Sequence, residues 1–373
     1  MEPVKLFLTG DVMTGRGIDQ ILPRPVDPTL HEPWIEDARV YVELAERANG
    51  PIPRLAAPAA FSYVWGDALA ELERVRPAAR IVNLETAVTT SDAHWPGKGI
   101  HYRMHPGNAP VLTAAGIDCC VLANNHVLDW GYPGLEETLS TLHGAGLRTA
   151  GAGRDLKEAR DPAVIETGAG HRVLVVALAS VTSGVPGEWA ATEERSGIFL
   201  PPEPPEEVVP QVREVLERAR RPGDLVLASV HWGGNWGHRV PEEQRRLARR
   251  LIDEAGVAVV HGHSSHHPKA IEVHRDRLVL YGCGDFLTDY EGIGGQEEYR
   301  SDLALAYLPA LDPATGKLRG LTITPFVHRR FRLQRASAED SRWLATLLTH
   351  QGRAFGTRVE VGADGRLRLL WET

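Results

Sequence analysis

Residues 257–266 read VAVVHGHSSH, an apolar run that passes directly into a cluster of histidines. A short run of apolar, largely β-branched residues is typical of a buried strand. The last histidines then fall at the carboxyl end of that strand, where ligands bind in open α/β sheets. We therefore predict that His263 and His266 belong to a binding site, whereas His261 points into the sheet.

Apolar runs of the same kind recur along the chain, and amphipathic stretches separate them. Strands are expected at residues 5–10, 79–85, 119–123, 172–179, 224–231, 257–261, 271–274, 277–281, 303–311 and 318–326. Helices are expected at residues 57–76, 135–143, 206–220, 241–255 and 338–348, and a hairpin within 358–371. This pattern predicts an α/β fold in which two mixed β-sheets pack face to face with helices outside.

Two long connections interrupt the pattern, at residues 18–56 and 285–301. Connections of more than about 12–15 residues are often lids over a functional site. For the first, which is rich in proline, a plain surface insertion is an equally good interpretation.

Composition narrows the possible partners. The 373 residues carry a formal net charge of -8, which gives no general attraction to nucleic acid or to anionic membranes. No run approaches the ~20 apolar residues that span a bilayer, and the first strand begins too early for a secretory signal. With only three cysteines, none in a disulfide-like pattern, a cytoplasmic protein is expected.

Polar side chains follow the carboxyl ends of four more predicted strands. They are Asp11, Glu85, Asn125 with His126, and His231. One strand-end aspartate is usually a helix cap and one histidine is usually structural. Five such strand ends in one chain indicate instead that carboxylate, amide and imidazole groups converge on a shared cation.

These motifs resemble the CapA family, named for poly-γ-glutamate capsule synthesis, within the calcineurin-like metallophosphoesterase superfamily. The matching segments run in family order from residue 10 to about 290. They are Gly10-Asp11-Val12-Met13 with Arg16, Asn83-Leu84-Glu85, Ala123-Asn124-Asn125-His126 with Asp129 and Gly131, His231-Trp232-Gly233, Gly262-His263 with His266, and Tyr281-Gly282-Cys283-Gly284-Asp285-Phe286. The resemblance implies a catalytic domain over residues 1–335, with the helix and hairpin of residues 336–373 packed on it.

The resemblance also implies a divalent-metal site for Mn, Zn, Ca or Mg. Its ligands by position would be Asp11 and His266 for one ion, Asn125, His231 and His263 for another, and Glu85 between them. His126 would be the acid/base. Asp129 would orient its ring or, equally well, cap the following helix.

Three positions depart from the superfamily pattern. Met13 stands where a histidine ligand is usual, and Glu85 stands where an aspartate is usual. One metal position thereby loses an imidazole ligand. The resemblance then implies either a single ion, or a second ion that is bound weakly or is Ca²⁺ or Mg²⁺. Asp285, an asparagine in many CapA-like proteins, is a candidate base, a group that orients a ligand, or a cap.

Candidate substrate contacts are one basic residue and three aromatic residues near the motifs: Arg16, Trp95, Trp236 and Tyr290. For the aromatic residues, a wall of the substrate site and ordinary packing are equally good interpretations. His267, which precedes a proline, is expected at the surface.

A metal beside an imidazole acid/base supports several reactions. The family resemblance favours a peptide or glutamyl-type substrate, with either epimerisation at the Cα of a C-terminal residue or amide hydrolysis. Epimerisation requires two acid/base groups, which His126 with Asp129 and a partner among Asp11, Asp285 and His266 would supply. The alternatives are phosphoester hydrolysis and a non-catalytic role in capsule assembly.

Overall fold

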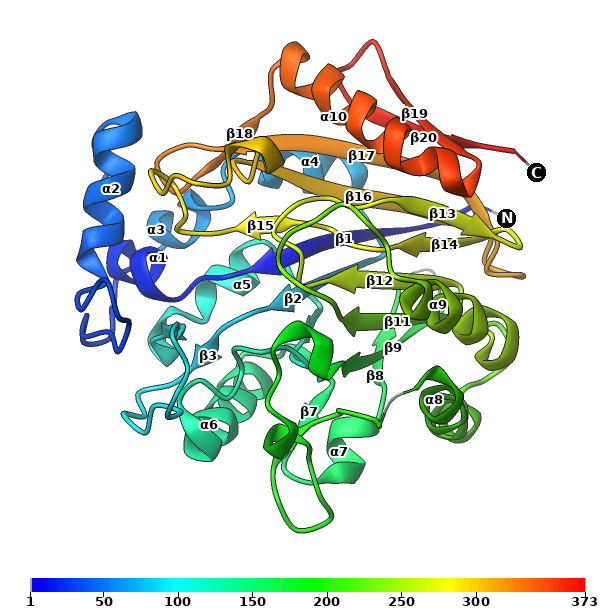
Figure 1. The fold of residues 1–373 in the computed structure, drawn as a ribbon, viewed down its shortest axis with the longest axis horizontal. Helices are drawn as coiled ribbons and strands as arrows, with labels where there is room; N and C mark the ends of the chain where they lie inside the picture. The colour runs from blue at the N-terminus through cyan, green and yellow to red at the C-terminus, as the bar shows by residue number, and fades with distance from the viewer. Residues whose placement is uncertain (1, 169, 203, 373) are drawn as a thin grey trace.

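The fold is built on two mixed β-sheets in the part of the chain that the computed structural model describes, residues 2–168, 170–202 and 204–372 (Figure 1). The larger sheet has the strand order β19-β20-β17-β16-β1-β2-β5-β6, with β15 paired to β1 and β18 paired to β17. Its strands are β1 (Val4–Val12), β2 (Ala79–Leu84), β5 (Cys119–Val121), β6 (Arg148–Ala150), β15 (Asp285–Leu287), β16 (Leu303–Leu311), β17 (Leu318–His328), β18 (Leu333–Arg335), β19 (Thr357–Val361) and β20 (Leu367–Trp371).

The smaller sheet has the strand order β13-β14-β12-β11-β9-β8. Its inner strands β9, β11, β12 and β14 are parallel, and an antiparallel strand closes each edge. Its strands are β8 (Ala163–Glu166), β9 (Arg172–Ala179), β11 (Leu225–His231), β12 (Val259–His263), β13 (Ile271–His274) and β14 (Arg277–Leu280).

Helices and two short ladders complete the fold. The ladders join β3 (Ala87–Val88) to β4 (Arg103–Met104) and β7 (Ala152–Gly153) to β10 (Gly197–Ile198). The helices are α1 (Arg16–Ile21), α2 (Arg39–Asn49), α3 (Ala59–Tyr63), α4 (Asp67–Val75), α5 (Pro110–Ala114), α6 (Gly131–Gly144), α7 (Leu156–Arg160), α8 (Pro205–Ala219), α9 (Glu242–Ala255) and α10 (Ala338–Gly352). Among the described residues, no helix is long and apolar enough to cross a membrane.

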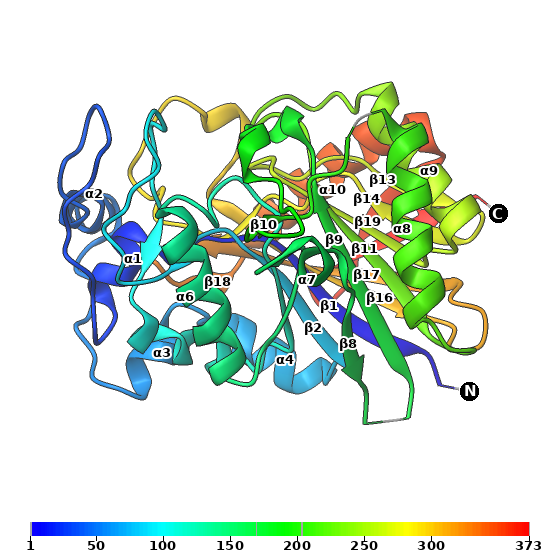
Figure 2. The ribbon, with the colours of Figure 1, turned by 90° about the horizontal axis from the view of Figure 1, so that it is seen from below.

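The alternation of side chains along β9 shows how the layers stack. Val173 and Val175 face the larger sheet and join its hydrophobic core. Leu174 and Val176 face the other way and join a second core with α8 and α9. Successive side chains of a strand point to opposite faces of the sheet. Other elements must therefore pack on both faces of this continuous apolar strand. Figure 2 shows α8 and α9 along the outer side of the smaller sheet.

The helix predicted at residues 57–76 is two helices, α3 and α4, that meet at Gly66. This glycine has φ +47°, which a helix interior does not permit. A Cβ there would lie 2.0 Å from the carbonyl oxygen of Leu333, so the chain turns where β18 passes close by.

The two connections expected to be irregular contain regular structure. Within residues 18–56, α2 is an amphipathic helix that buries Tyr41, Val42 and Ala45. Within residues 285–301, the first three residues form β15, a parallel neighbour of β1. Both were missed because prolines dominate the first segment and a three-residue strand is too short for a periodic pattern.

The C-terminal part of the chain extends the larger sheet. The expected hairpin is present as β19 and β20, and β20 pairs with β17. Glu71 on α4 fastens this end, because Arg366 ahead of β20 donates to both of its carboxylate oxygens at 3.0 and 2.5 Å.

Candidate active site

Two carboxylates lie at the ends of neighbouring parallel strands and share one amide. Asp11 on β1 pairs in register with Asn83 on β2. The Asn83 Nδ2 donates to Asp11 Oδ1 at 2.8 Å and to Glu85 Oε2 at 2.9 Å. The Asn83 Oδ1 in turn accepts from Asn124 Nδ2 at 3.0 Å. This chain of side-chain amides fixes Asp11 and Glu85 as two buried carboxylates in one site.

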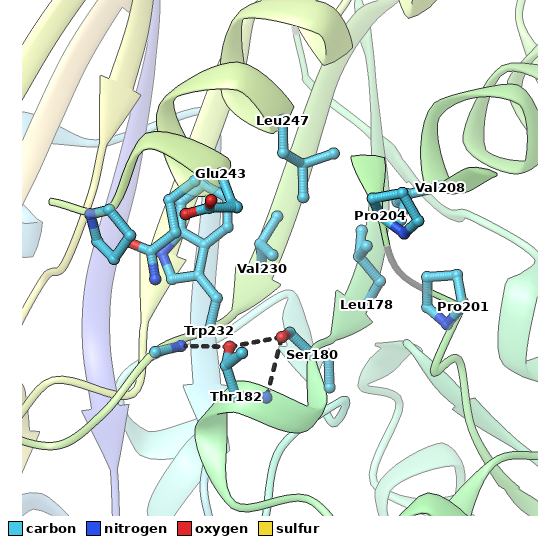
Figure 3. A pocket seen from close by; sticks show the side chains of 14 residues that line it. Leu178, Ser180, Thr182, Pro201, Pro204, Val208, Val230, Trp232, Glu243 and Leu247 are labelled. Carbon is cyan, nitrogen blue, oxygen red and sulfur yellow. Dashed lines mark hydrogen bonds between the residues drawn. The ribbon is translucent and has the colours of Figure 1, made fainter. Parts of the chain in front are cut away.

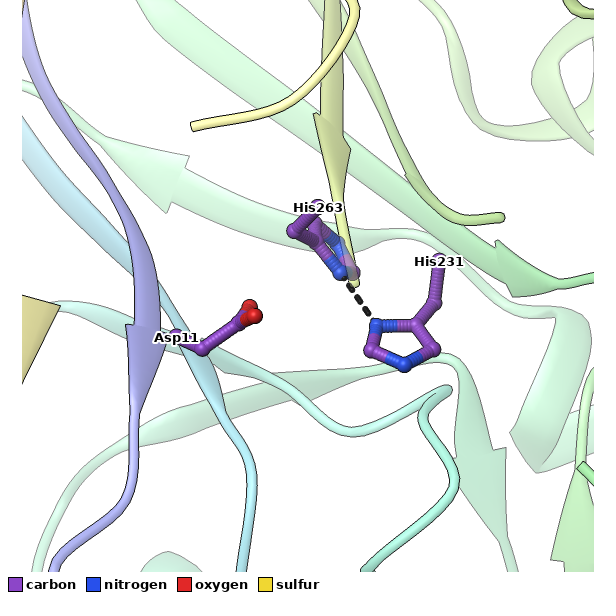
Figure 4. A group of neighbouring side chains, drawn as sticks. All are labelled: Asp11, His231 and His263. Atoms are coloured by element: carbon purple, nitrogen blue, oxygen red, sulfur yellow. Dashed lines mark hydrogen bonds between the residues drawn. The ribbon is translucent and has the colours of Figure 1, made fainter. Parts of the chain in front are cut away.

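Two imidazoles approach from the smaller sheet. His231 and His263 end the paired strands β11 and β12 and are opposite one another in register. Their Nδ1 atoms lie 2.7 Å apart, and Figure 4 shows both rings near Asp11. Ser229 fixes His263 from behind through a 2.8 Å bond to Nε2. His261 points into the sheet as predicted, with its Nε2 bound to the carbonyl of Thr9.

These side chains form two adjoining groups with metal-ligand chemistry, and Asp11 belongs to both. In one group, atoms of Asp11, His231 and His263 all lie within 4.8 Å of one another. In the other, Asp11 lies equally close to His266 and Asp285. The second group exists because β15 places Asp285 directly opposite Asp11 in the ladder.

A divalent cation fits this donor set. Asp11 Oδ2 and Asp285 Oδ2 are both buried and have no hydrogen-bond partner among the described residues. An unpaired buried carboxylate oxygen is costly unless it coordinates a cation or gains a proton. Imidazole and carboxylate together are ligands that Mn, Zn and related ions accept.

The electrostatics of the site also favour a cation. Burial, together with the charge of Asp285, raises the pKa of Asp11 to about 7. Burial and the neighbouring Asp11 raise the pKa of Glu85 well above its usual value. Burial lowers the pKa of His231 and of His263 well below the usual value, so both rings are neutral and each offers a lone pair. A positive ion would offset the crowded carboxylates without competing with protonated imidazoles.

A histidine–aspartate pair stands beside the carboxylates. The Nδ1 of His126 lies 2.6 Å from Asp129 Oδ2, while its Nε2 lies 3.9 Å from Glu85 Oε1. The backbone N–H of Tyr102 also donates to Asp129 Oδ2, at 2.7 Å. Burial lowers the pKa of His126 to about 4, so the ring is neutral with Nε2 facing the site. This geometry supports the orienting role for Asp129.

A second pair of the same kind lies on the Asp11 side of the site. His266 Nδ1 is 2.8 Å from Asp285 Oδ1, and the ring of Tyr290 stands edge-on to His266 with centroids 5.3 Å apart. Burial acts to lower the pKa of His266, but Asp285 and Asp11 outweigh it, and the pKa is raised. The two histidine–aspartate pairs thus differ: the imidazole of His126 is neutral, and that of His266 is more basic.

The structure brings the predicted ligands together in a grouping that differs from the expected one. Asp11, rather than Glu85, is common to both candidate groups. Glu85 Oε1 lies 3.9 Å from His231 Nε2, and Asn125 Oδ1 lies 3.1 Å from the same nitrogen. Glu85 and Asn125 therefore border the cluster on the side of His231 that faces His126.

Arg16, one of the four predicted substrate contacts, forms ion pairs within the protein. Its guanidinium is buried between Asp289 and Glu32, at 2.6 and 2.9 Å. Trp95 packs edge-on against Trp189, beside the loop that carries Lys98. In this conformation the two ion pairs of Arg16 hold the surrounding loops together.

Tyr290 and Trp236 lie closer to the candidate ligands. Both rings contact His266, Tyr290 edge-on and Trp236 tilted at 5.5 Å. The surface location expected for His267 is wrong, because the residue is fully buried. Its ring stacks on the ring of Trp236. The proline that follows His267 in the sequence gave no reason to expect this contact.

Lys98 is a site residue that the sequence did not reveal. Its Nζ donates to Asp129 Oδ1 and to the backbone carbonyl of Asn125. Although burial acts to raise the pKa of Asp129, His126 and Lys98 together hold it below its usual value. The signal was a single lysine within Pro96-Gly97-Lys98-Gly99, a turn with no periodic pattern.

The fold and this cluster define an α/β protein with a buried histidine–carboxylate site at converging strand ends. Residues 5–290 match the family model described as "Bacterial capsule synthesis protein PGA_cap", and the chain belongs to that family, as its motifs predicted.

The names of two similar curated proteins refer to polyglutamine synthesis and to PGA biosynthesis. The probable polyglutamine synthesis accessory protein of Mycobacterium tuberculosis (strain H37Rv) is 46% identical over 368 residues, covering 98% of this chain and 96% of its own. The PGA biosynthesis protein CapA of Bacillus subtilis (strain 168) is 28% identical over 192 residues, covering 52% of this chain and 48% of its own. One solved structure, described as GAP50, the anchor in the inner membrane complex of Plasmodium, aligns over 98% of this chain and 99% of its own. Its TM-score of 0.34 and 8% identity are too low to bear on the fold.

Proposed function

We propose that this protein is a divalent-metal-dependent acid–base enzyme with the calcineurin-like metallophosphoesterase fold, and that it hydrolyses an amide bond in a glutamyl-type peptide. One observation carries the proposal. The His126–Asp129 pair presents a neutral imidazole nitrogen 3.9 Å from Glu85, at the border of the cluster formed by Asp11, His231 and His263.

Asp11, His231 and His263 would hold one cation, and Asp11 with His266 and Asp285 would hold a second. A divalent cation bound there polarises a substrate oxygen and acidifies water. The protein's own groups supply the rest. Asn83 and Ser229 hold Asp11 and His263 in place through bonds of 2.8 Å each.

His126 would move the proton. Asp129 accepts from Nδ1–H and so leaves the Nε2 lone pair toward the site. During hydrolysis Nε2 would take a proton from the attacking water as the C–O bond forms, and would deliver it to the departing amine as the C–N bond breaks. Lys98 and Tyr102 keep Asp129 oriented through this cycle.

A glutamyl substrate is supported by the names of the relatives, which refer to polyglutamine synthesis and to PGA biosynthesis. A polyanionic chain would be repelled by a cluster of bare carboxylates, and the protein as a whole carries a charge of -8. The cation that the cluster favours would remove that local repulsion and attract a substrate carboxylate.

Epimerisation at a Cα is the second candidate, because the site holds two histidine–aspartate pairs. His126 with Asp129 stands by Glu85, and His266 with Asp285 stands by Asp11. Removal of a proton from one face and its return from the other requires two such groups. Their different pKa directions would suit one base and one acid.

The test uses chelator-treated protein supplied with Mn²⁺ or Zn²⁺ and a γ-linked glutamate polymer. Hydrolysis predicts the appearance of new amino groups and shorter chains, lost in His126→Ala and retained in His350→Ala, an exposed histidine on α10. In deuterated water, epimerisation predicts deuterium at Cα without cleavage.

Two outcomes would refute the proposal. Turnover of an aryl phosphate alone would favour the phosphoesterase alternative. A capsule or polymer phenotype that is fully restored by His126→Ala would favour a non-catalytic accessory role.

A further inference from the structure

Two different environments flank β11. Val230 and Trp232 belong to the core formed with α8 and α9, where an apolar cavity of about 280 Å³ lies (Figure 3). His231 lies between them in the sequence and faces Asp11 instead. Because adjacent residues of a strand face opposite sides, we expect side chains that support the site by packing to lie on the Asp11 side. Arg16, which follows Asp11 closely in the sequence, is such a side chain.

The guanidinium of Arg16 is fixed by two carboxylates. Its Nε and Nη2 donate to Asp289 Oδ2 and Oδ1 at 3.0 and 2.6 Å, and its Nη1 donates to Glu32 Oε1 at 2.9 Å. The residue is buried. A guanidinium held in this bidentate way has a single orientation.

The backbone of Arg16 is strained. Its φ is +47°, in a region that residues with a Cβ rarely occupy. Gly17, the next residue, packs so closely that a Cβ there would lie 2.8 Å from the Cβ of Tyr41, and its N–H donates to Asp289 Oδ2 at 2.9 Å. The surrounding contacts therefore hold Arg16 in place against the strain, a situation common at functional sites.

Two tyrosine rings connect Arg16 to the acid–base histidines. The guanidinium carbon lies 4.4 Å from the ring centroid of Tyr102 and 5.8 Å from that of Tyr290. Both distances are within the roughly 6 Å of a cation–π contact. The Tyr102 ring stands at 83° to the imidazole of His126, with centroids 4.8 Å apart. The Tyr290 ring stands at 80° to that of His266, with centroids 5.3 Å apart. Arg16 is thus one aromatic ring away from each histidine.

Each imidazole is held from two directions. The Nδ1 of His126 is bound to Asp129 at 2.6 Å, and the Nδ1 of His266 is bound to Asp285 at 2.8 Å. A single hydrogen bond leaves a ring free to tilt about it, and the edge-on tyrosine restricts that tilt. Together the two contacts fix the direction of the remaining ring nitrogen.

We propose that Arg16 is a positioning residue that fixes the imidazoles of His126 and His266 at the same time, through Tyr102 and Tyr290. The two histidine–aspartate pairs then form one unit, and a change at Arg16 reaches both. This inference rests on the proposed acid–base function, in which His126 moves the proton during hydrolysis and both histidines are needed for epimerisation.

The first test does not require activity. In protein isotope-labelled at its histidine nitrogens, NMR observes the Nδ1–H protons of His126 and His266, assigned with His126→Gln and His266→Gln, and measures their exchange with water. Arg16→Lys keeps the charge and every aromatic ring but loses the bidentate fork. We expect it to speed the exchange of both protons roughly three- to ten-fold. Arg366→Lys, which alters a similar fork onto Glu71, should change neither.

Tyrosine variants separate the two arms. Tyr102→Leu should speed exchange at His126 alone, and Tyr290→Leu at His266 alone. Tyr102→Phe keeps the ring and should retain wild-type exchange, since it loses only a long contact of the hydroxyl. The two leucine variants decide the question if Arg16→Lys does not fold.

The second test uses the polymer assay. Arg16→Lys and Tyr102→Leu should lower kcat roughly three- to ten-fold with little change in KM, because positioning acts on the chemical step. A wild type without turnover would refute the proposed function, and the NMR measurement would still decide the positioning role. Unchanged exchange of either proton in Arg16→Lys, or of both protons in the leucine variants, would overturn the inference.

Discussion

Asp11 belongs to both candidate cation groups, so its replacement tests the whole site. A cation that binds the folded chain alone, present at 100 times its Kd, stabilises the protein by about 2.7 kcal/mol. For 373 residues, the entropy of unfolding at about 2.1 cal/mol/K per residue is about 0.8 kcal/mol/K. Restoring Mn²⁺ or Zn²⁺ to chelator-treated protein should therefore raise Tm by about 3–4 °C.

Asp11→Asn should abolish most of this rise while leaving the metal-free protein folded. Burial and Asp285 raise the pKa of Asp11 to about 7, so its charge is disfavoured when no cation is present. A neutral amide of the same shape therefore costs the metal-free fold little. Asp161→Asn, at an exposed aspartate that pairs with Lys157, is the matched control and should keep the full rise.

Differential scanning fluorimetry across Mn²⁺, Zn²⁺, Mg²⁺ and Ca²⁺ measures these shifts, and elemental analysis of the purified protein identifies the ion. If no cation raises the Tm of the wild type, or if Asp11→Asn retains the same rise, Asp11 is not a shared metal ligand.

Three further predictions concern the acid–base pair and the fold. Asp129→Asn should lower kcat about 10²–10⁴-fold, because it disturbs the orientation and charge of His126. KM and the cation-induced Tm shift should change little, since Asp129 is not in either candidate cation group. Activity within three-fold of the wild type in the polymer assay would contradict this. Although burial opposes the effect, Arg366 and Arg74 lower the pKa of Glu71 to about 2. Glu71→Gln should therefore lower the free energy of unfolding at pH 7, measured in urea, by about 2 kcal/mol, which is the pKa shift converted to energy and reduced for solvent screening. The difference from the wild type should shrink as pH falls from ~4.5 to 2, since a depressed pKa stabilises only the ionised form. Gly66→Ala should cost more than about 1 kcal/mol in the same unfolding assay, because the new Cβ would meet the carbonyl of Leu333, whereas Gly187→Ala, which has open space, should cost much less; equal losses would show that the turn at Gly66 is not constrained.

Long apolar runs were the most predictable part of the fold. The strands expected at residues 172–179 and 303–311 are β9 and β16 to the residue, because a strand buried on both faces must be apolar throughout. The break at Gly66 was not predictable, since it depends on a carbonyl brought close by β18, which lies more than two hundred residues away in the sequence. Patterns within a short stretch of sequence contain no information about contacts between residues so far apart.

The same limit applied to the site. Ligand-type residues at strand ends were visible because each follows an apolar run, and the structure brings Asp11, His231 and His263 within reach of one ion. Their metal-binding and catalytic roles stay predictions. Lys98 was invisible because it acts from a turn with no periodicity, through Asp129 rather than on the cluster itself.

The placement of β15 explains why Asp11 rather than Glu85 is common to both candidate groups. Glu85 follows β2 and shares an amide with Asp11, but β15 adds Asp285 on the opposite side of β1. Asp11 thus lies between two carboxylates contributed by neighbouring strands, with imidazoles from the smaller sheet above it. An asparagine at residue 285 would remove one of these charges and make the second cation group weaker. If the two candidate groups each hold an ion, Asp285→Asn should therefore bind fewer ions than the wild type, and elemental analysis of both proteins would decide it.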